Sequence, residues 1–322
     1  MLRVLITSDT EVKVSSVKPD LSNIREAVVR DIYGITSSGE FGIRYQAETL
    51  NNHGLKGVFF LESLSAKAVG TSHLCEIVDS IKGRGHDTQL HVHAEWLKRL
   101  PEDFFRGRRD RFFKDFSQEE QLFLIGQGLE ALRACGVQNI CAFRSGNLRM
   151  NMDTLRALSR TGIIYDSSYD LLYQGRGSDL NMGRPFFQPM RMSGVCEIPV
   201  TVFQDWPGHY RHAQLSACSA EEMQRALLAA WRNGWYTIVI LVHSLELVHR
   251  ARERITPNYI VIKRFTQLCD FLSRHDDKFL VTTFSELDPS MIYEMNVKPL
   301  SSNVLFTAKR FAEQLSQKWA RR

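Results

Sequence analysis

The sequence lacks any apolar run that approaches the roughly 20 residues needed to span a bilayer as a helix. Its start is apolar from Leu2 to Thr7, but acidic residues follow directly and no small-residue cleavage site appears. We therefore interpret this segment as a first strand and not as a signal peptide. No repeat, low-complexity segment or Pro/Gly/Ser-rich linker divides the chain, which predicts a single domain over residues 1–322.

Paired cysteine motifs are also missing. The six cysteines are scattered, and none forms a Cys-x-x-Cys pair. Most lie in apolar segments, where an unpaired cysteine packs as a small core residue. The sequence therefore predicts neither a disulfide framework nor a thiolate zinc site. Together with the missing signal peptide, this favours a cytoplasmic protein.

A strong excess of one charge is absent as well, because the formal net charge is only +5. Such a mild excess predicts no nucleic-acid partner. The basic residues are unevenly placed, with one cluster over 106–114 and a second in the tail from Lys309 to Arg322. Each cluster is either a solvated surface or a contact for a phosphate-bearing substrate or an anionic membrane.

Short apolar runs rich in branched residues alternate along the chain with helical periodicity. The expected strands are Leu2–Thr7, Val58–Leu61, Thr88–His93, Ile140–Phe143, Ile163–Tyr165, Val195–Val202, Thr237–Val242 and Phe279–Thr283. The clearest expected helices, each followed closely by a glycine, are Glu119–Cys135, Asn151–Ser159 and Ser219–Trp231. Seven or eight such units favour a closed or nearly closed (β/α) barrel, and no dinucleotide fingerprint follows the first strand.

Charged side chains and imidazoles follow five of these expected strands, at the point where each strand ends. They are Asp9 and Glu11, His91 and His93, Arg144, Asp166, and His243. In a parallel barrel the carboxyl ends of all strands open on one face, where the active sites of such folds are built. The sequence therefore predicts that these side chains meet at one mouth of the barrel.

His91 and His93 are two residues apart, so on an extended segment both imidazoles point to the same side. Two adjacent imidazoles and a carboxylate oxygen can hold Zn²⁺ or a similar cation at about 2.1 Å. Asp9 and Glu11 share a face in the same way, which suits one carboxylate as a metal ligand and one as a free base. We therefore predict a metal site at this mouth.

The remaining strand-end residues each allow two interpretations. His243 follows a strongly apolar strand and is either a hydrogen-bonded core residue or a general acid/base, and its place at the mouth favours the second. Arg144 and Asp166 are either an ordinary ion pair or a functional pair. In the functional pair, Arg144 fixes the base and lowers its pKa, while Asp166 orients the arginine.

Taken in order, these strand ends resemble the motifs of the polysaccharide deacetylase superfamily, also called the nodulation-type deacetylase homology domain or carbohydrate esterase family four. The matching segments are Thr7–Glu11, Gly85–Trp96, Phe143–Asn147, Gly162–Ser168, Glu197–Val200 and Leu241–Ser244. Any one of them is a weak signal, but six in the right order form a strong one. The resemblance spans roughly residues 5–285, which is nearly the whole chain.

The resemblance implies a distorted (β/α) barrel of about seven strands with one divalent metal ion, commonly zinc. The implied metal ligands are Glu11, His91 and His93. The implied catalytic residues are Asp9 as base and His243 as general acid, with Arg144 and Asp166 as the pair that tunes the pKa of the base. The family usually has two adjacent aspartates and two histidines four residues apart. This chain departs from both patterns, and its spacing fits an Asp-x-Glu and His-x-His subgroup. Glu95 therefore remains an alternative ligand to His93, and Asp9 an additional one.

These features predict a metal-dependent hydrolase that removes an N-acetyl or N-formyl group from an amino sugar. The missing export signal favours a nucleotide- or lipid-linked intermediate of surface polysaccharide biosynthesis, whose phosphate would meet residues 106–114. A basic amphipathic helix near 303–322 would either pack on the barrel or rest on the inner membrane. Two alternatives remain, a metal hydrolase of a non-sugar amide and a non-catalytic carbohydrate-binding relative.

Overall fold

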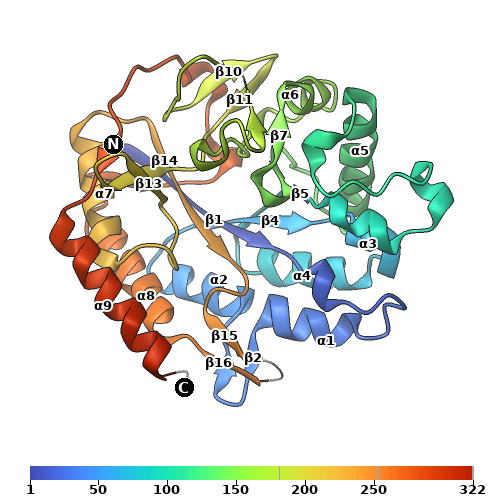
Figure 1. The fold of residues 1–322 in the computed structure, drawn as a ribbon, viewed down its shortest axis with the longest axis horizontal. Coiled ribbons are helices and arrows are strands. Elements are labelled where there is room, and N and C mark those ends of the chain that lie inside the picture. Colours follow the sequence, from blue (N-terminus) through green and yellow to red (C-terminus); the bar gives the residue numbers. More distant parts are fainter. Residues whose placement is uncertain (181, 252–253, 321–322) are drawn as a thin grey trace.

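The computed structural model describes residues 1–180, 182–251 and 254–320, and a curled sheet wrapped by helices lies at its centre (Figure 1). Within these residues the sheet has nine strands. Its order is β10 (Met190–Met192), β11 (Val195–Glu197), β8 (Tyr165–Asp166), β6 (Ala142–Ser145), β5 (Asp87–Val92), β4 (Val58–Glu62), β1 (Leu2–Thr10) and β14 (Thr237–His243), with β17 (Phe279–Val281) also paired to β1. Only β10 runs antiparallel to its neighbour. The expected α/β class and distorted, mostly parallel barrel are confirmed.

Helices connect and cover the strands (Figure 1). They are α1 (Ile24–Val28), α2 (Ile43–Asn52), α3 (Ser65–Val69), α4 (Ser72–Lys82), α5 (Gln118–Ala134), α6 (Met152–Ser159), α7 (Ala220–Arg232), α8 (Tyr259–Ser273) and α9 (Val304–Ala320). Capping boxes begin α5 at Ser117 with Glu120 and α7 at Ser219 with Glu222, so the first backbone N–H groups of both helices have acceptors. The three helices expected from the sequence are confirmed to within one residue at either end.

Smaller elements lie between the main strands and helices. The short strands are β2 (Ile35–Thr36), β3 (Gly39–Glu40), β7 (Met150–Asn151), β9 (Ser178–Asp179), β12 (Val202–Trp206), β13 (His209–His212), β15 (Val248–Ala251), β16 (Arg254–Pro257) and β18 (Leu300–Ser301). Single turns of 3-10 helix cover Val14–Ser16, Ala94–Arg99, Glu102–Phe105, Phe113–Asp115, Gly146–Leu148, Leu171–Tyr173, Phe284–Glu286 and Pro289–Met291, and a π-helical turn covers Val29–Tyr33.

The strand expected over Val195–Val202 is divided in the structure. Strand β11 ends at Glu197 and stays in the barrel, whereas β12 begins at Val202 and pairs with β13 and β18 outside it. Pro199 lies between the two and cannot donate a ladder hydrogen bond, so the chain changes sheets there.

The barrel interior explains why the strand ends carry the polar groups. Successive side chains of a strand point to opposite faces, so Leu5, Thr7 and Asp9 of β1 share the inward face. Leu5 and Val239 of β14 belong to an apolar cluster that fills the barrel, together with side chains of β4, β6, β8 and β11. Asp9 and His243 are register partners at the top of these two strands, above that apolar filling. The sheet therefore delivers its last inward residues to one mouth.

Helix α9 packs on the barrel through a buried ionic network. The Arg310 guanidinium is 1% exposed and lies 2.8 Å from Asp205 Oδ2 and 3.1 Å from Glu222 Oε2. Leu305 and Phe311 are exposed on the same helix. Of the two interpretations of this segment, packing on the barrel is therefore what the structure shows, and contact of its outer side with a membrane stays a prediction. No helix in the described ranges is both long and apolar enough to cross a bilayer.

A disulfide joins Cys75 of α4 to Cys135 just after α5. The sequence predicted no disulfide framework, and this single pair departs from that expectation because the two helices pack side by side and bring together cysteines that are 60 residues apart. The other four cysteines are free and buried, as expected. Cysteine usage therefore no longer favours the cytoplasm.

Candidate metal centre

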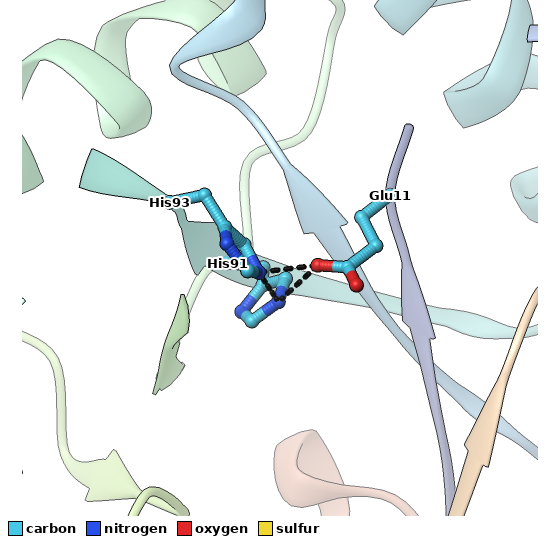
Figure 2. A group of neighbouring side chains, drawn as sticks. All are labelled: Glu11, His91 and His93. Atoms are coloured by element: carbon cyan, nitrogen blue, oxygen red, sulfur yellow. Dashed lines mark hydrogen bonds and ion pairs between the residues drawn. The ribbon is translucent and has the colours of Figure 1, made fainter. Parts of the chain in front are cut away.

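Three predicted ligands meet at the mouth of the barrel. The Nε2 atoms of His91 and His93 are 3.1 Å apart, and Glu11 Oε2 lies 3.3 Å from His91 Nε2 and in contact with His93 Nε2. Figure 2 shows both imidazoles turned toward the Glu11 carboxylate, with the histidines coming from one segment and the glutamate from another. All three ligand atoms lie within 4.8 Å of one another, so these residues could hold a metal ion.

The donor set and its spacing fit a small divalent cation. Four ligand atoms arranged tetrahedrally at about 2.1 Å from zinc lie roughly 3.4 Å apart, close to the distances given above. Burial alone would raise the pKa of the Glu11 carboxyl, but His93 and His91 hold that pKa well below its usual range. Glu11 is therefore an ionised carboxylate, the form in which it can bind a metal.

Neighbouring groups orient both imidazoles. His91 Nδ1 lies 2.7 Å from the carbonyl oxygen of Arg144, an arrangement that places the proton on Nδ1 and leaves Nε2 free as a ligand. His93 Nδ1 lies 3.7 Å from Glu95 Oε2. Gly146 packs against the His93 ring so closely that an added Cβ would lie 2.7 Å from the ring. A glycine is therefore required there for His93 to keep its position.

The alternative ligands lie outside this group. Glu95 sits on the Nδ1 side of His93, and its Oε1 accepts a hydrogen bond from Arg111 Nε at 2.7 Å. Asp9 Oδ1 is held by Arg144 instead. Among the described residues, the only group of this kind consists of Glu11 and the two histidines.

Asp9 is fixed by a buried ion pair. Arg144 Nη1 donates to Asp9 Oδ1 at 2.5 Å and to the Thr7 hydroxyl at 3.0 Å, and Arg144 is fully buried. The Arg144 guanidinium also stacks on Phe60, with its Cζ atom 4.2 Å from the ring centroid. A buried guanidinium with this many partners cannot turn away, so the Asp9 carboxylate is held rigidly beside the metal ligands.

Ser167, and not Asp166, accepts the hydrogen bonds that fix the other side of the Arg144 guanidinium. Arg144 Nε donates to the Ser167 carbonyl at 2.9 Å, and Nη2 donates to its hydroxyl at 3.1 Å. The structure shows no hydrogen bond between Asp166 and Arg144. Asp166 lies opposite Glu197 in the β8–β11 ladder, and both carboxyls are fully buried. Burial raises the pKa of both groups, and the charge of Asp166 raises that of Glu197 further.

His243 faces Asp9 from the adjacent strand. Its Nε2 lies 3.9 Å from Asp9 Oδ2, and its Nδ1 lies 2.9 Å from Glu246 Oε1. Gln214 donates to the same Glu246 carboxylate and stands beside the His243 ring. Burial disfavours the charged imidazole, but the hydrogen bond to Glu246 and the charges of Glu246 and Asp9 outweigh this and raise the pKa of His243 to about 9. His243 is therefore protonated at neutral pH.

Two residues of the site were missed in the sequence. Glu246 lies two residues after the matching segment Leu241–Ser244, and its contact with the His243 imidazole depends on a local turn that no spacing rule indicates. Glu62 ends β4 opposite His91 and accepts hydrogen bonds from the backbone N–H groups of Leu64 and Ser65. Burial raises the pKa of the Glu62 carboxyl. Its position directly after the apolar run Val58–Leu61 is the feature of the sequence that could have indicated Glu62 as a site residue.

Two cavities meet at the candidate metal centre. One of about 450 Å³ is lined by Asp9, His91, His243, Tyr173, His212 and neighbouring residues. The second, of about 500 Å³, is lined by Lys13, Lys98, Arg99, Glu95 and neighbouring residues. Both include Glu11, His93, Arg111 and Asn147 in their linings, so the ligands stand where the two join. Cavities of this size accept a small molecule such as a sugar with one or two substituents.

Most charges of the 106–114 cluster are engaged locally. Arg108 pairs with Asp110 and Glu120, and Arg109 donates to the carbonyls of Leu97 and Leu100. Lys114 pairs with Asp179. Arg111 is the member of this cluster that lines both cavities.

No family model and no curated protein matches the chain. Among solved structures it is similar to a putative polysaccharide deacetylase from Mycobacterium smegmatis, with 16% identity, coverage of 88% of both chains and a TM-score of 0.57. A family 4 carbohydrate esterase from Streptomyces lividans in complex with acetate matches with 12% identity over 93% of this chain and 98% of that chain, at a TM-score of 0.44. The first likeness shows the fold. The chain therefore has the same fold as that putative polysaccharide deacetylase, which is the fold that its motifs predicted.

Proposed function

We propose that the chain is a metal-dependent deacylase that removes an N-acyl group, acetyl or formyl, from an amino sugar. The observation that carries the proposal is the grouping of Glu11, His91 and His93 beside an Asp9 carboxylate and a protonated His243. A hydrolase of amides needs a metal or oxyanion site, a base for water and an acid for the leaving amine. Candidates for each lie within one cavity.

Glu11, His91 and His93 would hold the metal, and the two-imidazole, one-carboxylate set favours zinc. When bound, the ion supplies Lewis acidity at the acyl carbonyl and lowers the pKa of a water molecule. Asp9 would accept the proton of that attacking water, because its carboxylate borders the same cavity and cannot rotate away from Arg144. Arg144 is thus a positioning residue for the base.

His243 would donate a proton to the leaving amine. Its pKa of about 9 keeps the imidazole charged at neutral pH, and Glu246 fixes the ring through Nδ1, so that Nε2 faces Asp9 and the cavity. An amine is a poor leaving group unless it is protonated as the bond breaks. The two functions are therefore divided between an ionised carboxylate and a charged imidazole 3.9 Å apart.

An amino sugar fits the lining of this cavity better than a flat or fully apolar amide. Tyr173 and Phe112 border it with aromatic side chains, and the Arg149 guanidinium stacks on both, 3.9 and 5.2 Å from the ring centroids. Aromatic faces beside polar donors are suited to a pyranose ring, which carries C–H groups and hydroxyls together. We propose a nucleotide- or lipid-linked amino sugar as the substrate.

The test begins with the metal content of the purified protein, measured by elemental mass spectrometry on wild type and on His91→Ala/His93→Ala. We expect one divalent metal per chain in the wild type and its loss in the variant. A control variant, His73→Ala/His275→Ala, changes two histidines away from the ligand group and should keep the metal. Absence of metal from the wild type after reconstitution would refute the hydrolase and favour a carbohydrate-binding relative.

The second step is a substrate panel with the metal-loaded protein. Release of acetate or formate from N-acylated amino sugars supports the proposal. Release of acyl groups or ammonia only from non-sugar amides would replace it with the alternative metal hydrolase. The same panel with Asp9→Asn, which keeps the shape of the side chain but removes its charge, should show loss of turnover with the metal retained.

A further inference from the structure

The second cavity at the metal centre is strongly basic. We call it the basic groove, and define it by Lys13, Lys98, Arg99 and Arg111, which line it together with Glu11 and Glu95. Arg111 forms an ion pair with Glu95, and Glu11 faces the two imidazoles. The remaining three cations of the groove have no acidic counterpart among its lining residues.

The three remaining cations are available to a ligand. Within the described ranges, none of Lys13, Lys98 and Arg99 forms an ion pair with a carboxylate. Lys13 and Lys98 are exposed. Arg99 is held by the carbonyl oxygens of Val14 and Val17, so its position is fixed while its charge stays uncompensated. Three unpaired positive charges around a cavity of about 500 Å³ create a positive potential that attracts an anion.

The chain segments that carry the metal ligands also carry the basic groove. Lys13 follows Glu11 by two residues, and its backbone N–H donates to the buried Asp31 carboxylate at 3.1 Å. Lys98 and Arg99 lie on the 3-10 helix Ala94–Arg99, which begins directly after His93. The cations therefore lie at defined positions along the chain relative to the metal ligands. One substrate molecule can then contact the basic groove and the metal centre together.

We propose that the basic groove binds a phosphate or diphosphate group of the substrate while the acylated amine lies at the metal centre. This inference rests on the proposed function and adds the chemical class of the substrate. Neutral polysaccharides have no group that needs three cations beside the reacting amide. The inference also assigns the phosphate contact, which the sequence predicted for residues 106–114, to the basic groove. Of that stretch, Arg111 is the residue that lines the groove.

The experiment compares two double variants of the metal-loaded, full-length protein. Lys13→Glu/Lys98→Glu reverses two charges of the groove, and Lys263→Glu/Lys298→Glu makes the same change of net charge at exposed lysines that line neither cavity. The substrates are a neutral N-acetylamino sugar, its 1-phosphate, and its uridine-diphosphate and short prenyl-diphosphate forms. Steady-state kinetics at low salt give KM and kcat for each, and elemental mass spectrometry checks the metal content.

For the phosphorylated sugars we expect the groove variant to raise KM on the order of tenfold, since two attractions are lost and two repulsions replace them. For the neutral sugar its kcat/KM should match the wild type, and the control variant should match the wild type throughout. The diphosphate form with the higher kcat/KM identifies the source of the anion. An unchanged KM for every phosphorylated sugar, or an equal rise for the neutral sugar, would overturn the inference.

Failure of the proposed function is distinguished by a binding measurement. If no amide is cleaved, titration calorimetry with inorganic pyrophosphate still tests the groove. Any contact of pyrophosphate with the metal is the same in the wild type and in both variants. Weaker binding by the groove variant alone therefore supports an anion site in the groove. Equal binding by wild type and both variants rejects it.

Discussion

Glu246→Gln tests the assignment of His243 as the proton donor. The change removes the negative charge beside the imidazole but keeps an oxygen that can accept the hydrogen bond from Nδ1, now 2.9 Å away. A hydrogen bond to a charged group contributes roughly 1.5–3 kcal/mol, which corresponds to about one to two pKa units. We therefore expect the His243 pKa to fall from about 9 in the wild type to about 7.5 in the variant.

The sign of the pH effect follows from the role of the proton. A general acid acts while protonated, so kcat/KM is full below the pKa of His243 and falls as pH rises through it. At about pH 8.5 the protonated fraction would drop from roughly three quarters to roughly one tenth, an eightfold loss of kcat/KM, with little change at about pH 6.5. The assay is the pH profile of acyl release by the metal-loaded protein.

The matched control is Glu130→Gln, which removes a carboxylate on the exposed side of α5. Its profile should superimpose on that of the wild type. If the basic limb of the Glu246→Gln profile also superimposes on the wild type, His243 is not the group whose deprotonation limits activity. The division of roles between Asp9 and His243 would then have to be withdrawn.

Three further substitutions probe the supports of the site and the fold. Arg144→Met leaves the buried Asp9 carboxylate without its cation, so urea titration should show a loss of roughly 3–5 kcal/mol and turnover should vanish. Arg310→Ala leaves the buried Glu222 carboxylate without its cation, while Asp205 keeps Arg211 and His209, and should cost a similar roughly 3–5 kcal/mol. Lys309→Ala, on the exposed side of α9, should cost less than about 1 kcal/mol. Equal losses would contradict the buried network. Gly146→Ala places a methyl group 2.7 Å from the His93 ring and should weaken metal binding about 10–100-fold in a chelator competition. Unchanged affinity would show that His93 is not needed as a ligand.

The barrel and the ligand group could be predicted because both depend on simple periodicities of the chain. A period of two places His91 and His93 on one side of a strand, and parallel strands end on one face, so the amino-acid order alone indicates their meeting with Glu11. The resemblance in motif order supplied the roles of Asp9 and His243, whose meeting across the β1–β14 ladder follows the same rule.

Contacts made by turns and between distant helices could not be predicted in this way. The chain turns after β8, so Ser167 accepts the hydrogen bonds of Arg144 that were expected to involve Asp166. Glu246 reaches His243 through a turn of similar kind. The pairing of Cys75 with Cys135 depends on how α4 and α5 pack, and neither spacing nor composition contains that information.

That pairing has a consequence for the metal centre, although it lies on the outside of the barrel. The loop that it closes runs from α4 to the end of α5 and includes strand β5, which carries His91, and His93 directly after that strand. In the loop-closure account, a link across 60 residues lowers the entropy of the unfolded chain enough to stabilise the fold by about 4 kcal/mol. Reduction would therefore leave the ligand geometry unchanged but make the segment that carries it easier to unfold. The redox state of the surroundings would then affect how long a metal bound at the candidate site is retained.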